Sequence, residues 1–406
     1  MAATQHSRTA RRTPAVREDR APQRVAGAAQ LAPNARRKAL LDILPRYFPL
    51  VPRPKPACGS LTERLDRLHH KANLARSDDN PLVHAAEALN LAALIASDCA
   101  MPQLARDLCW RQIYRFTTGP GPYDHTTATL ALQPLINLAR LHTRQGDGTT
   151  AYHLHEALLR AAHTRSDLRI DGHTIPLDAL VTYGEDHAKI VQWLWTILLG
   201  SGLRALCQTG QWTDAYHQAL QHRGIGCRLL DGRQIAILHH ATTSQSAEAT
   251  SILDHSDTPD QWEHAVTAHL QFITHVLTGD RTDDGAADMA DAHLTVTSAP
   301  EPVPGAFHLR LWLITTELLH ITGQSSRVGI AMSDQLLDAA LRDAYLARDV
   351  VTARADTALT DASRSQLHTT LLRSNLGTPL TAENLDRLLK AARQSETALA
   401  IQLRRR

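Results

Sequence analysis

Residues 193–226 read WLWTILLGSGLRALCQTGQWTDAYHQALQHRGIG and contain three of the six tryptophans, Trp193, Trp195 and Trp212. Apolar residues recur at helical spacing on both sides of Gly210-Gln211. This spacing predicts two amphipathic helices joined by a tight turn. Looser versions of the same unit occur along most of the chain. We therefore predict an all-α fold of stacked helical hairpins.

The composition of the chain supports this fold class. The 406 residues exceed one typical compact domain, so they form either two or three domains or one extended array. Aromatic residues make up only 4%, so the core consists mainly of Leu, Ala, Ile and Val. Leucine and alanine favour helix. The net charge of +2 gives no global electrostatic reason to expect binding to nucleic acid or to an anionic membrane.

Several patterns bear on location. The N-terminus has arginines but no apolar run, so it does not resemble a secretory signal. The apolar runs LNLAALIA and WLWTILLG are shorter than the ~20 residues of a membrane span. The five cysteines include no C-x-x-C pair, and most sit among apolar residues, as buried thiols do in a reducing cytosol. We expect a cytoplasmic protein without a membrane segment.

The chain divides into five expected regions. Residues 1–34 form a disordered basic tail, with contact to nucleic acid as the alternative role. Residues 35–59 form a short helix (35–44, with Asn34 as a possible N-cap) and a proline-rich linker, which could also be a ligand for a proline-binding module. Residues 60–297 form the helical array, 298–305 a second linker, and 306–406 C-terminal helices that continue the array.

Local signals fix some element boundaries. Ser60 and Glu63 form a capping box, and Asn80-Pro81 starts another helix. Asp171-Gly172 lies between two short Ile-containing runs, which predicts a small inserted β-hairpin near 168–176. Near the end of the chain we expect a turn at Gly323-Gln324, a helix through about 347, and helices over 350–373 and 381–405.

The turns follow a rule in which a small residue precedes an alanine by five positions. Gly210 and Ala215 are the clearest pair, and Gly146 with Ala151 and Ala100 with Ala105 repeat it. With Leu138-Ala139 upstream of Gly146, the pattern resembles the tetratricopeptide (TPR) class. It is also similar to actinomycete α-solenoid proteins of unknown function. The resemblance implies a concave groove that binds a peptide or protein partner, in a regulatory or assembly role.

The resemblance directs attention to polar and aromatic residues on the first helices of hairpins and on the break that follows. Residues 222–234 (HRGIGCRLLDGRQ) place glycines among arginines, which could bind an anionic group or could simply be a helix break with surface arginines. The groove residues we predict are Asn137, Arg140, Arg144, Trp193, Arg204, His222, Arg223, Asp231 and Arg233.

The sequence lacks the common catalytic signatures. G-x-S-x-G, Walker A, C-x-x-C and helix-turn-helix motifs are missing from the sequence, so we expect a non-enzymatic protein without a cofactor. One alternative is an all-α, Mg²⁺-dependent enzyme acting on a diphosphate or another anionic substrate. Its metal ligands would be Asp283, Asp284 and Asp288, in the order D-D-x-x-x-D. Aspartates at a helix N-terminus are also favoured by the helix dipole alone.

Overall fold

A computed structural model of the chain describes residues 31–77, 79–279, 283–297, 304–325, 328, 331–353 and 359–405; the side chains of residues 283, 284 and 297 lie outside the description. The elements up to residue 208 are α1 (Pro33–Tyr47), α2 (Leu61–Ser77), α3 (Pro81–Asp98), α4 (Pro102–Thr117), α5 (His125–Arg144), α6 (Gly148–Thr164), β1 (Asp167–Ile170), β2 (His173–Pro176), α7 (Leu177–Leu180), α8 (Glu185–Ile197), η1 (Leu198–Gly202) and α9 (Leu203–Gln208). The later elements are α10 (Trp212–Gln221), α11 (Asp231–Thr242), α12 (Ser246–Asp254), α13 (Gln261–Thr278), α14 (Asp283–Thr297), α15 (Gly305–Thr322), α16 (Asp334–Arg342), α17 (Ala344–Thr352), α18 (Asp361–Ser374) and α19 (Ala382–Arg404).

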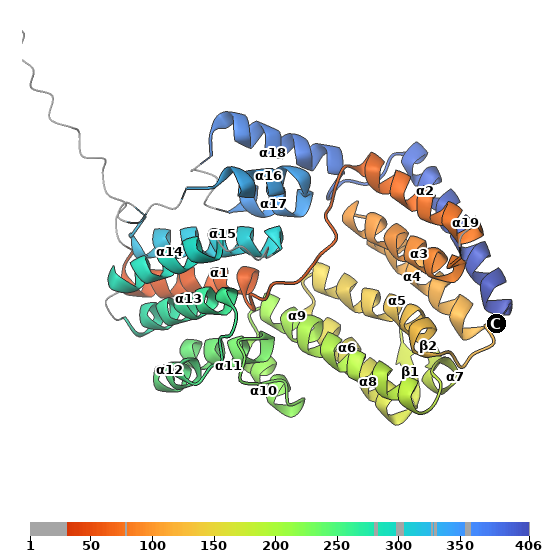
Figure 1. Cartoon of the computed structure of the whole chain (residues 1–406), viewed down its shortest axis with the longest axis horizontal. Helices are drawn as coiled ribbons and strands as arrows, with labels where there is room; N and C mark the ends of the chain where they lie inside the picture. Colours follow the sequence, from red (N-terminus) through yellow and green to blue (C-terminus); the bar gives the residue numbers. More distant parts are fainter. Residues whose placement is uncertain are drawn as a thin grey trace, which may run out of the picture.

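The fold is all-α, as predicted, and consecutive helices pair as hairpins. The pairs α3–α4, α5–α6, α11–α12 and α13–α14 pack side by side (Figure 1). The turn rule has a clear physical basis, because Gly146 and Gly210 adopt positive φ angles of 81° and 75°. The alanine five positions after each of these glycines is fully buried between the paired helices.

The opening stretch forms the predicted pair of helices with one unexpected feature. Helices α8 and α9 are one continuous rod joined by the π-helical turn η1, and α10 follows the turn at Gly210. Gly202 lies in this π turn, where an added Cβ would sit 2.9 Å from a methyl group of Leu198 and 3.4 Å from Cβ of His155. The glycine therefore lets α6 approach closely.

This rod, Glu185–Gln208, is the one helix among the described residues that is long and apolar enough to cross a membrane. Part of its apolar surface packs inside the protein. Leu194, Leu198 and Leu203 are buried, and the rod packs against α5, α6 and α11. Of the most apolar window of the rod, 44% is buried, and Trp195 remains exposed.

The predicted β-hairpin is confirmed. Strands β1 and β2 pair antiparallel, with Leu168 opposite Ile175, and both of these side chains are buried. Asp171 and Gly172 form the turn with φ angles of 50° and 79°. Positive φ at both central residues is the turn geometry that matches the twist of two paired strands.

The N-terminal region differs from expectation at its boundaries. Helix α1 begins at Pro33, with Ala32 rather than Asn34 at the N-cap, and continues through Pro45 to Tyr47 instead of ending at residue 44. Proline suits the first helical position, which explains the earlier start. Tyr47 and Phe48 are buried, and their packing stabilises the last turn despite Pro45. Of the predicted tail, residues 1–30 lie outside the described residues.

The later boundaries also need correction. The linker expected at 298–305 ends earlier, because α15 begins at Gly305, and residues 298–303 are not among those described. The helix expected from Gly323 to about 347 is replaced by α16, which starts only at Asp334, and α17. The break falls at Asp343, whose carboxylate accepts a hydrogen bond from the backbone N–H of Tyr345 and so caps α17. The helix expected over 350–373 begins at Asp361, after a Thr360 cap.

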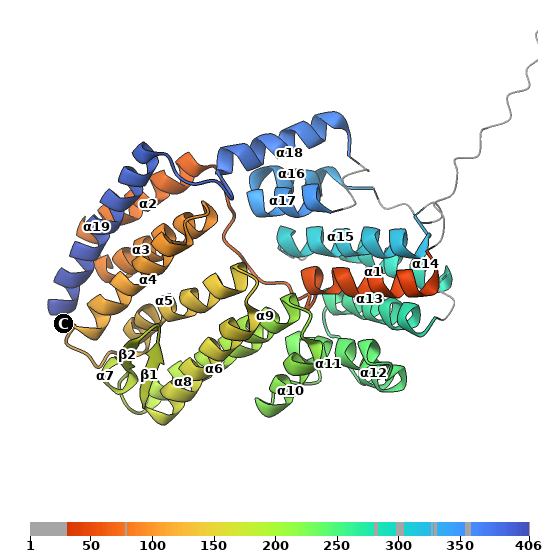
Figure 2. The same cartoon turned by 180° about the vertical axis from the view of Figure 1, so that it is seen from behind.

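The end of the chain returns to its beginning. Residues 306–406 were expected to continue the array; α15 packs beside α14 and α16 beside α15, whereas α19 packs against α3 and α2, with further contacts to α4 (Figures 1 and 2). At the other side of the molecule α1 lies beside α15 and α13 (Figure 2). Both ends of the array thus meet helices that are distant in sequence, which an open solenoid would not do.

Candidate functional site

Residues 48–60, here called the strap, form an extended connection between α1 and α2. The strap crosses the middle of the molecule, from the end of α1 near α9 to the start of α2 (Figure 1). Phe48, Leu50 and Cys58 are buried, whereas residues 53–57 are exposed. The strap is therefore held at both ends and open to solvent in its middle.

Gln234, on α11, recognises the backbone of the strap. Its side-chain Oε1 accepts a hydrogen bond from the N–H of Leu50 at 2.7 Å, and its Nε2 donates to the carbonyl of Leu50 at 3.0 Å. Nε2 also donates to the carbonyl of Leu229 at 2.7 Å. Gln234 is completely buried, so its amide pairs with a single peptide residue much as an adjacent β-strand would.

Charged side chains continue this contact on either side. Arg204, on α9, donates to the carbonyl of Pro49 at 2.6 Å. Arg53 of the strap makes a bidentate contact with Asp231 at the start of α11. Both terminal nitrogens of Arg53 donate to the carboxylate, and Nη1 lies 3.0 Å from Oδ1. Arg204 lies 3.6 Å from Oδ1 of the same carboxylate, the oxygen that Arg53 contacts at 3.0 Å. Asp231 thus links the strap, α9 and α11 at one point.

The far end of the strap is anchored through the break between α16 and α17. The N–H of Cys58 donates to Asp343 at 3.1 Å, and the carbonyl of Cys58 accepts from the N–H of Ala344 at 2.8 Å. Burial raises the pKa of the Cys58 thiol to about 11, so it stays protonated at neutral pH. This cysteine serves packing rather than nucleophilic chemistry.

A buried ionic cluster lies next to this anchor. Asp98 accepts hydrogen bonds from Arg64 at 2.9 Å, from Arg144 at 2.6 Å and from the hydroxyl of Tyr345 at 2.7 Å. Arg64 also donates to the carbonyl of Ser374. The cluster joins α2, α3 and α5 to α17 and α18.

The residues predicted from the sequence separate into groups. Arg204 and Asp231 come together and both contact the strap. Arg144 lies on α5 in the Asp98 cluster, and on the same helix Arg140 is within 3.4 Å of Asn137. Asn137 also donates to the side chain of Asn90 on α3, so it helps to join neighbouring hairpins.

Other predicted residues have different surroundings. The guanidinium group of Arg233 forms its hydrogen bonds within the fold. It donates to the carbonyls of Gly226, Ile252 and His255 and to the hydroxyl of Ser256. Trp193 is partly buried against the core. Arg223 is exposed and has a φ of 51°, which marks the left-handed residue that follows α10.

Two of the three glycines in the same stretch lie in close contacts. A Cβ added to Gly232 would lie 2.2 Å from the carbonyl oxygen of Gly224, and one added to Gly224 would lie 2.5 Å from a methyl group of Leu199. The chain after α10 therefore crosses directly over the start of α11. Close packing accounts for Gly224 and Gly232, whereas Gly226 has open space around it.

His222 lines a hollow of about 780 Å³ between α6, α8 and the end of α10. Trp195 forms part of the wall, and its indole N–H donates to the carbonyl of His222 at 2.9 Å. The Nε2 atom of His222 makes no hydrogen bond and lies 3.8 Å from Glu156. His222 thus belongs to a different face from Arg204 and Asp231.

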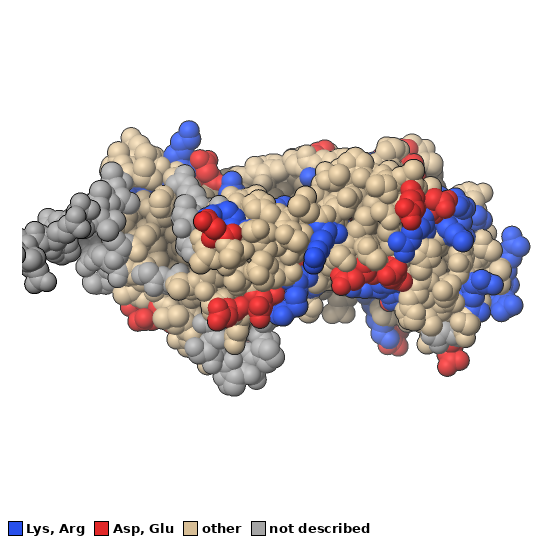
Figure 3. All heavy atoms as spheres, turned by 90° about the horizontal axis from the view of Figure 1, so that it is seen from above, with Lys and Arg blue, Asp and Glu red and all other residues tan. Residues whose placement is uncertain are grey.

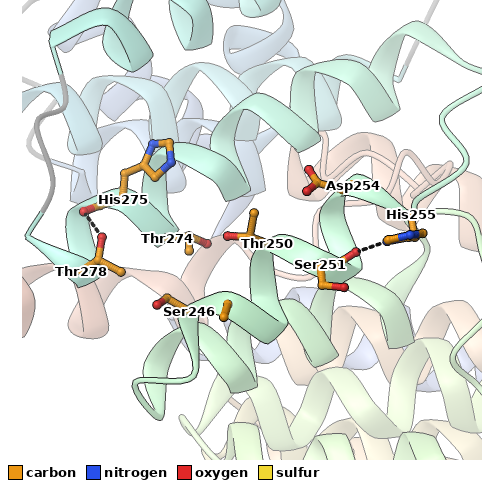
Figure 4. A pocket seen from close by; sticks show the side chains of 9 residues that line it. Ser246, Thr250, Ser251, Asp254, His255, Thr274, His275 and Thr278 are labelled. Carbon is orange, nitrogen blue, oxygen red and sulfur yellow. Dashed lines mark hydrogen bonds between the residues drawn. The ribbon is translucent and has the colours of Figure 1, made fainter.

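A second hollow, of about 430 Å³, lies between α12 and α13 and is lined largely by hydroxyl groups (Figure 4). It contains Ser251, Asp254 and His255, three residue types that can form a nucleophilic triad. However, Nδ1 of His255 contacts the backbone carbonyl of Ser251 at 2.7 Å rather than its hydroxyl (Figure 4). The geometry needed to activate a serine is not present in this hollow.

The alternative metal site gains no support from the described residues. Asp288 is exposed on α14, and the side chains of Asp283 and Asp284 are not described. Within the described ranges, His, Cys, Asp and Glu side chains form no group of three or more that could hold a metal ion. Asp283 is the first residue of α14, where the helix dipole favours a carboxylate without any metal.

Sequence reasoning missed Gln234, which makes the most specific contact to the strap. A signal was present, because Gln234 directly precedes the apolar run Ile235-Ala-Ile-Leu238 within one helix. A buried polar side chain needs partners, and the sequence could not name Leu50 as that partner.

The outer surface carries mixed charge. On the face seen in Figure 3, basic and acidic side chains lie next to one another, with basic groups more frequent toward the end where α19 terminates. Comparison of the chain with protein-family models, with curated proteins and with solved structures finds no match.

Proposed function

We propose that this protein is a non-enzymatic, TPR-like helical-repeat protein that binds an extended peptide segment of a protein partner, in a regulatory or assembly role. The observation that carries the proposal is the strap itself. Gln234, Arg204 and Asp231 hold it through its backbone and through one basic side chain. Backbone hydrogen bonds give affinity for any extended segment, and the pairing with Asp231 adds a preference for arginine.

The environment of the cysteines is consistent with binding inside the cell. All five cysteines are free, and four of them are buried. Free thiols persist in a reducing compartment, and we propose the cytoplasm as the place where the partner is met.

The proposal can be tested with the strap sequence supplied in trans. In the full-length Arg53→Ala variant, the strap keeps its backbone contacts with Gln234 and Arg204 but loses its contact with Asp231, so an added peptide that carries arginine can displace it. A fluorescein-labelled peptide of residues 48–57 should bind this variant, as measured by fluorescence polarisation. The same peptide with alanine in place of its arginine should bind at least tenfold more weakly.

One further variant and the wild-type protein complete the design. Adding Asp231→Ala to Arg53→Ala should abolish binding of the arginine-containing peptide, because the carboxylate that selects it is gone. The wild-type protein should bind the peptide weakly, because its own strap occupies the site. If the two peptides bind the Arg53→Ala variant equally, or if removal of Asp231 leaves binding intact, the proposed recognition is wrong.

A further inference from the structure

Four cationic side chains gather around the exposed middle of the strap. Arg53 and Lys55 belong to the strap itself, Arg204 extends from α9 and Arg310 from α15. The charges of Arg310, Arg204 and Arg53 all act on Lys55, and those of Arg310 and Arg53 act on Arg204. Three separate parts of the fold therefore bring positive charge to one place.

Few carboxylates compensate this charge. Asp231 serves both Arg53 and Arg204. Asp349, on α17, lies 3.8 Å from Arg310 and is also approached by Arg348 at 3.7 Å. These two carboxylates are thus shared among the arginines, and no ion pair or hydrogen bond to Lys55 is found within the described residues.

The surroundings of Lys55 disfavour its charge. Its side chain reaches solvent, but neighbouring protein atoms crowd it on the other sides. Partial burial, followed by the repulsion of Arg310 and Arg204, lowers the pKa of Lys55 to about 7, with Asp349 acting weakly in the opposite direction. Like charges held together at a cost to the folded state are common where a ligand of opposite charge binds.

We propose that Arg53, Lys55, Arg204 and Arg310 form a binding site for a phosphate group. A dianion would neutralise the positive charge that Asp231 and Asp349 leave uncompensated. Guanidinium groups present paired donors that fit the oxygens of a tetrahedral anion, and a lysine adds a point charge. Arg53 is 43% exposed and Arg310 24% exposed at the side chain, so both can reach an incoming ligand. The inference does not depend on a peptide partner.

The first experiment measures anion binding by isothermal titration calorimetry on the full-length protein. Sulfate is the probe, because its charge does not change between pH 6 and pH 8.5. Wild-type protein should bind sulfate at least tenfold more tightly at pH 6 than at pH 8.5, since Lys55 is charged only at the lower pH. Lys55→Met and Arg310→Met should each weaken binding at pH 6 by at least tenfold.

The chain offers a matched control for each variant. Lys390 is exposed on α19 and Arg169 is exposed on β1, and Figure 1 shows both elements away from the middle of the strap. Lys390→Met and Arg169→Met should leave sulfate binding unchanged. If sulfate does not bind, or if Lys390→Met weakens it as much as Lys55→Met does, the site is not where we place it.

The second experiment observes the lysine directly. The sequence has only five lysines, Lys38, Lys55, Lys71, Lys189 and Lys390. Reductive methylation with ¹³C-formaldehyde would give each a separate NMR signal, and Lys55→Met would assign the relevant one. Saturating sulfate should raise the pKa of Lys55 by at least one unit. An unchanged pKa would overturn the proposal even if sulfate bound elsewhere.

A third comparison identifies the source of the phosphate group. Inorganic phosphate and a short serine-phosphorylated peptide are titrated in parallel, with the unphosphorylated peptide as reference. Tighter binding of the phosphopeptide supports a phosphorylated protein segment, and equal binding supports the free ion. Binding of the unphosphorylated peptide with the same affinity would contradict the site. Failure here leaves the Arg53→Ala peptide experiment unaffected, because that peptide carries no phosphate.

Discussion

Replacement of Gln234 by leucine should destabilise the protein and release the start of the strap. Leucine has a similar volume but removes three buried hydrogen bonds, two with Leu50 and one to the carbonyl of Leu229. The N–H of Leu50 then has no acceptor in a buried position. A buried hydrogen-bond donor without an acceptor lowers the free energy of unfolding by about 1–3 kcal/mol. The loss of the two hydrogen bonds to the carbonyls of Leu50 and Leu229 adds to this. We expect a total loss of about 3 kcal/mol in the free energy of unfolding.

Two measurements check this value. Urea unfolding followed by circular dichroism gives the global loss, which is large against a typical stability of about 5–15 kcal/mol. Hydrogen exchange at the Leu50 amide gives the local effect, which should be at least tenfold faster exchange. Gln208→Leu is the matched control, because Gln208 is exposed at the end of α9 and should change stability by less than about 0.5 kcal/mol. Equal unfolding curves for the two variants, with Leu50 still protected, would refute the reasoning.

Three other predictions concern stability. Burial lowers the pKa of five described histidines from their ordinary 6.5, and three of them reach low values: His155 (about 3), His269 (about 4) and His293 (about 4). The free energy of unfolding should therefore be highest above pH 6.5 and fall as the pH drops toward 4, by about 1.4 kcal/mol per pH unit for each of these three histidines. Urea unfolding at pH 7, 6 and 5 measures this loss. A flat profile would show that they are protonated in the folded state. Asp98→Ala should lower the free energy of unfolding by about 3–5 kcal/mol, because it leaves Arg64 buried without a counter-ion. Asp386→Ala on the surface should leave the free energy of unfolding nearly unchanged in the same assay. Equal effects of the two substitutions would contradict the role of the cluster. Gly172→Ala should lower the free energy of unfolding by about 1 kcal/mol, because Gly172 has a φ of +79°. Gly226 has neither a positive φ nor a close neighbour, so Gly226→Ala should lower it less. Thermal unfolding compares the two variants, and the reverse order would be inconsistent with the turn geometry.

Elements with local signals could be predicted from the sequence. The turn at Gly210, the reciprocal capping of Ser60 and Glu63 and the β-hairpin at Asp171-Gly172 each depend on residues within a few positions of one another. Their chemistry is complete within the segment, because a turn needs only its own φ angles and a cap only its own first turn. Boundaries that depend on local chemistry were accordingly close to those observed.

Features that depend on distant partners could not be predicted in this way. Gln234 meets Leu50 across 184 positions, and Tyr345 meets Asp98 across 247. Asp343 looked like any helical aspartate in the sequence, but it caps α17 and receives the N–H of Cys58. The separation of His222 from Arg204 also reflects helix packing, because the sequence places both on one hairpin without showing which way each faces. A pattern of residue types says which side chains need partners but not which ones they find.

The position of α19 has a consequence for synthesis of the chain. Helices α2 and α3 leave the ribosome about 300 residues before α19, at a rate of roughly 5–20 residues per second. During that interval the side of α3 that α19 will cover stays open to water, although α3 is apolar around most of its circumference. The nascent protein therefore spends many seconds with an apolar surface that only α19 covers. A chain released before α19 is made would be prone to self-association, and a chaperone that covers α3 would be most useful until α19 has emerged.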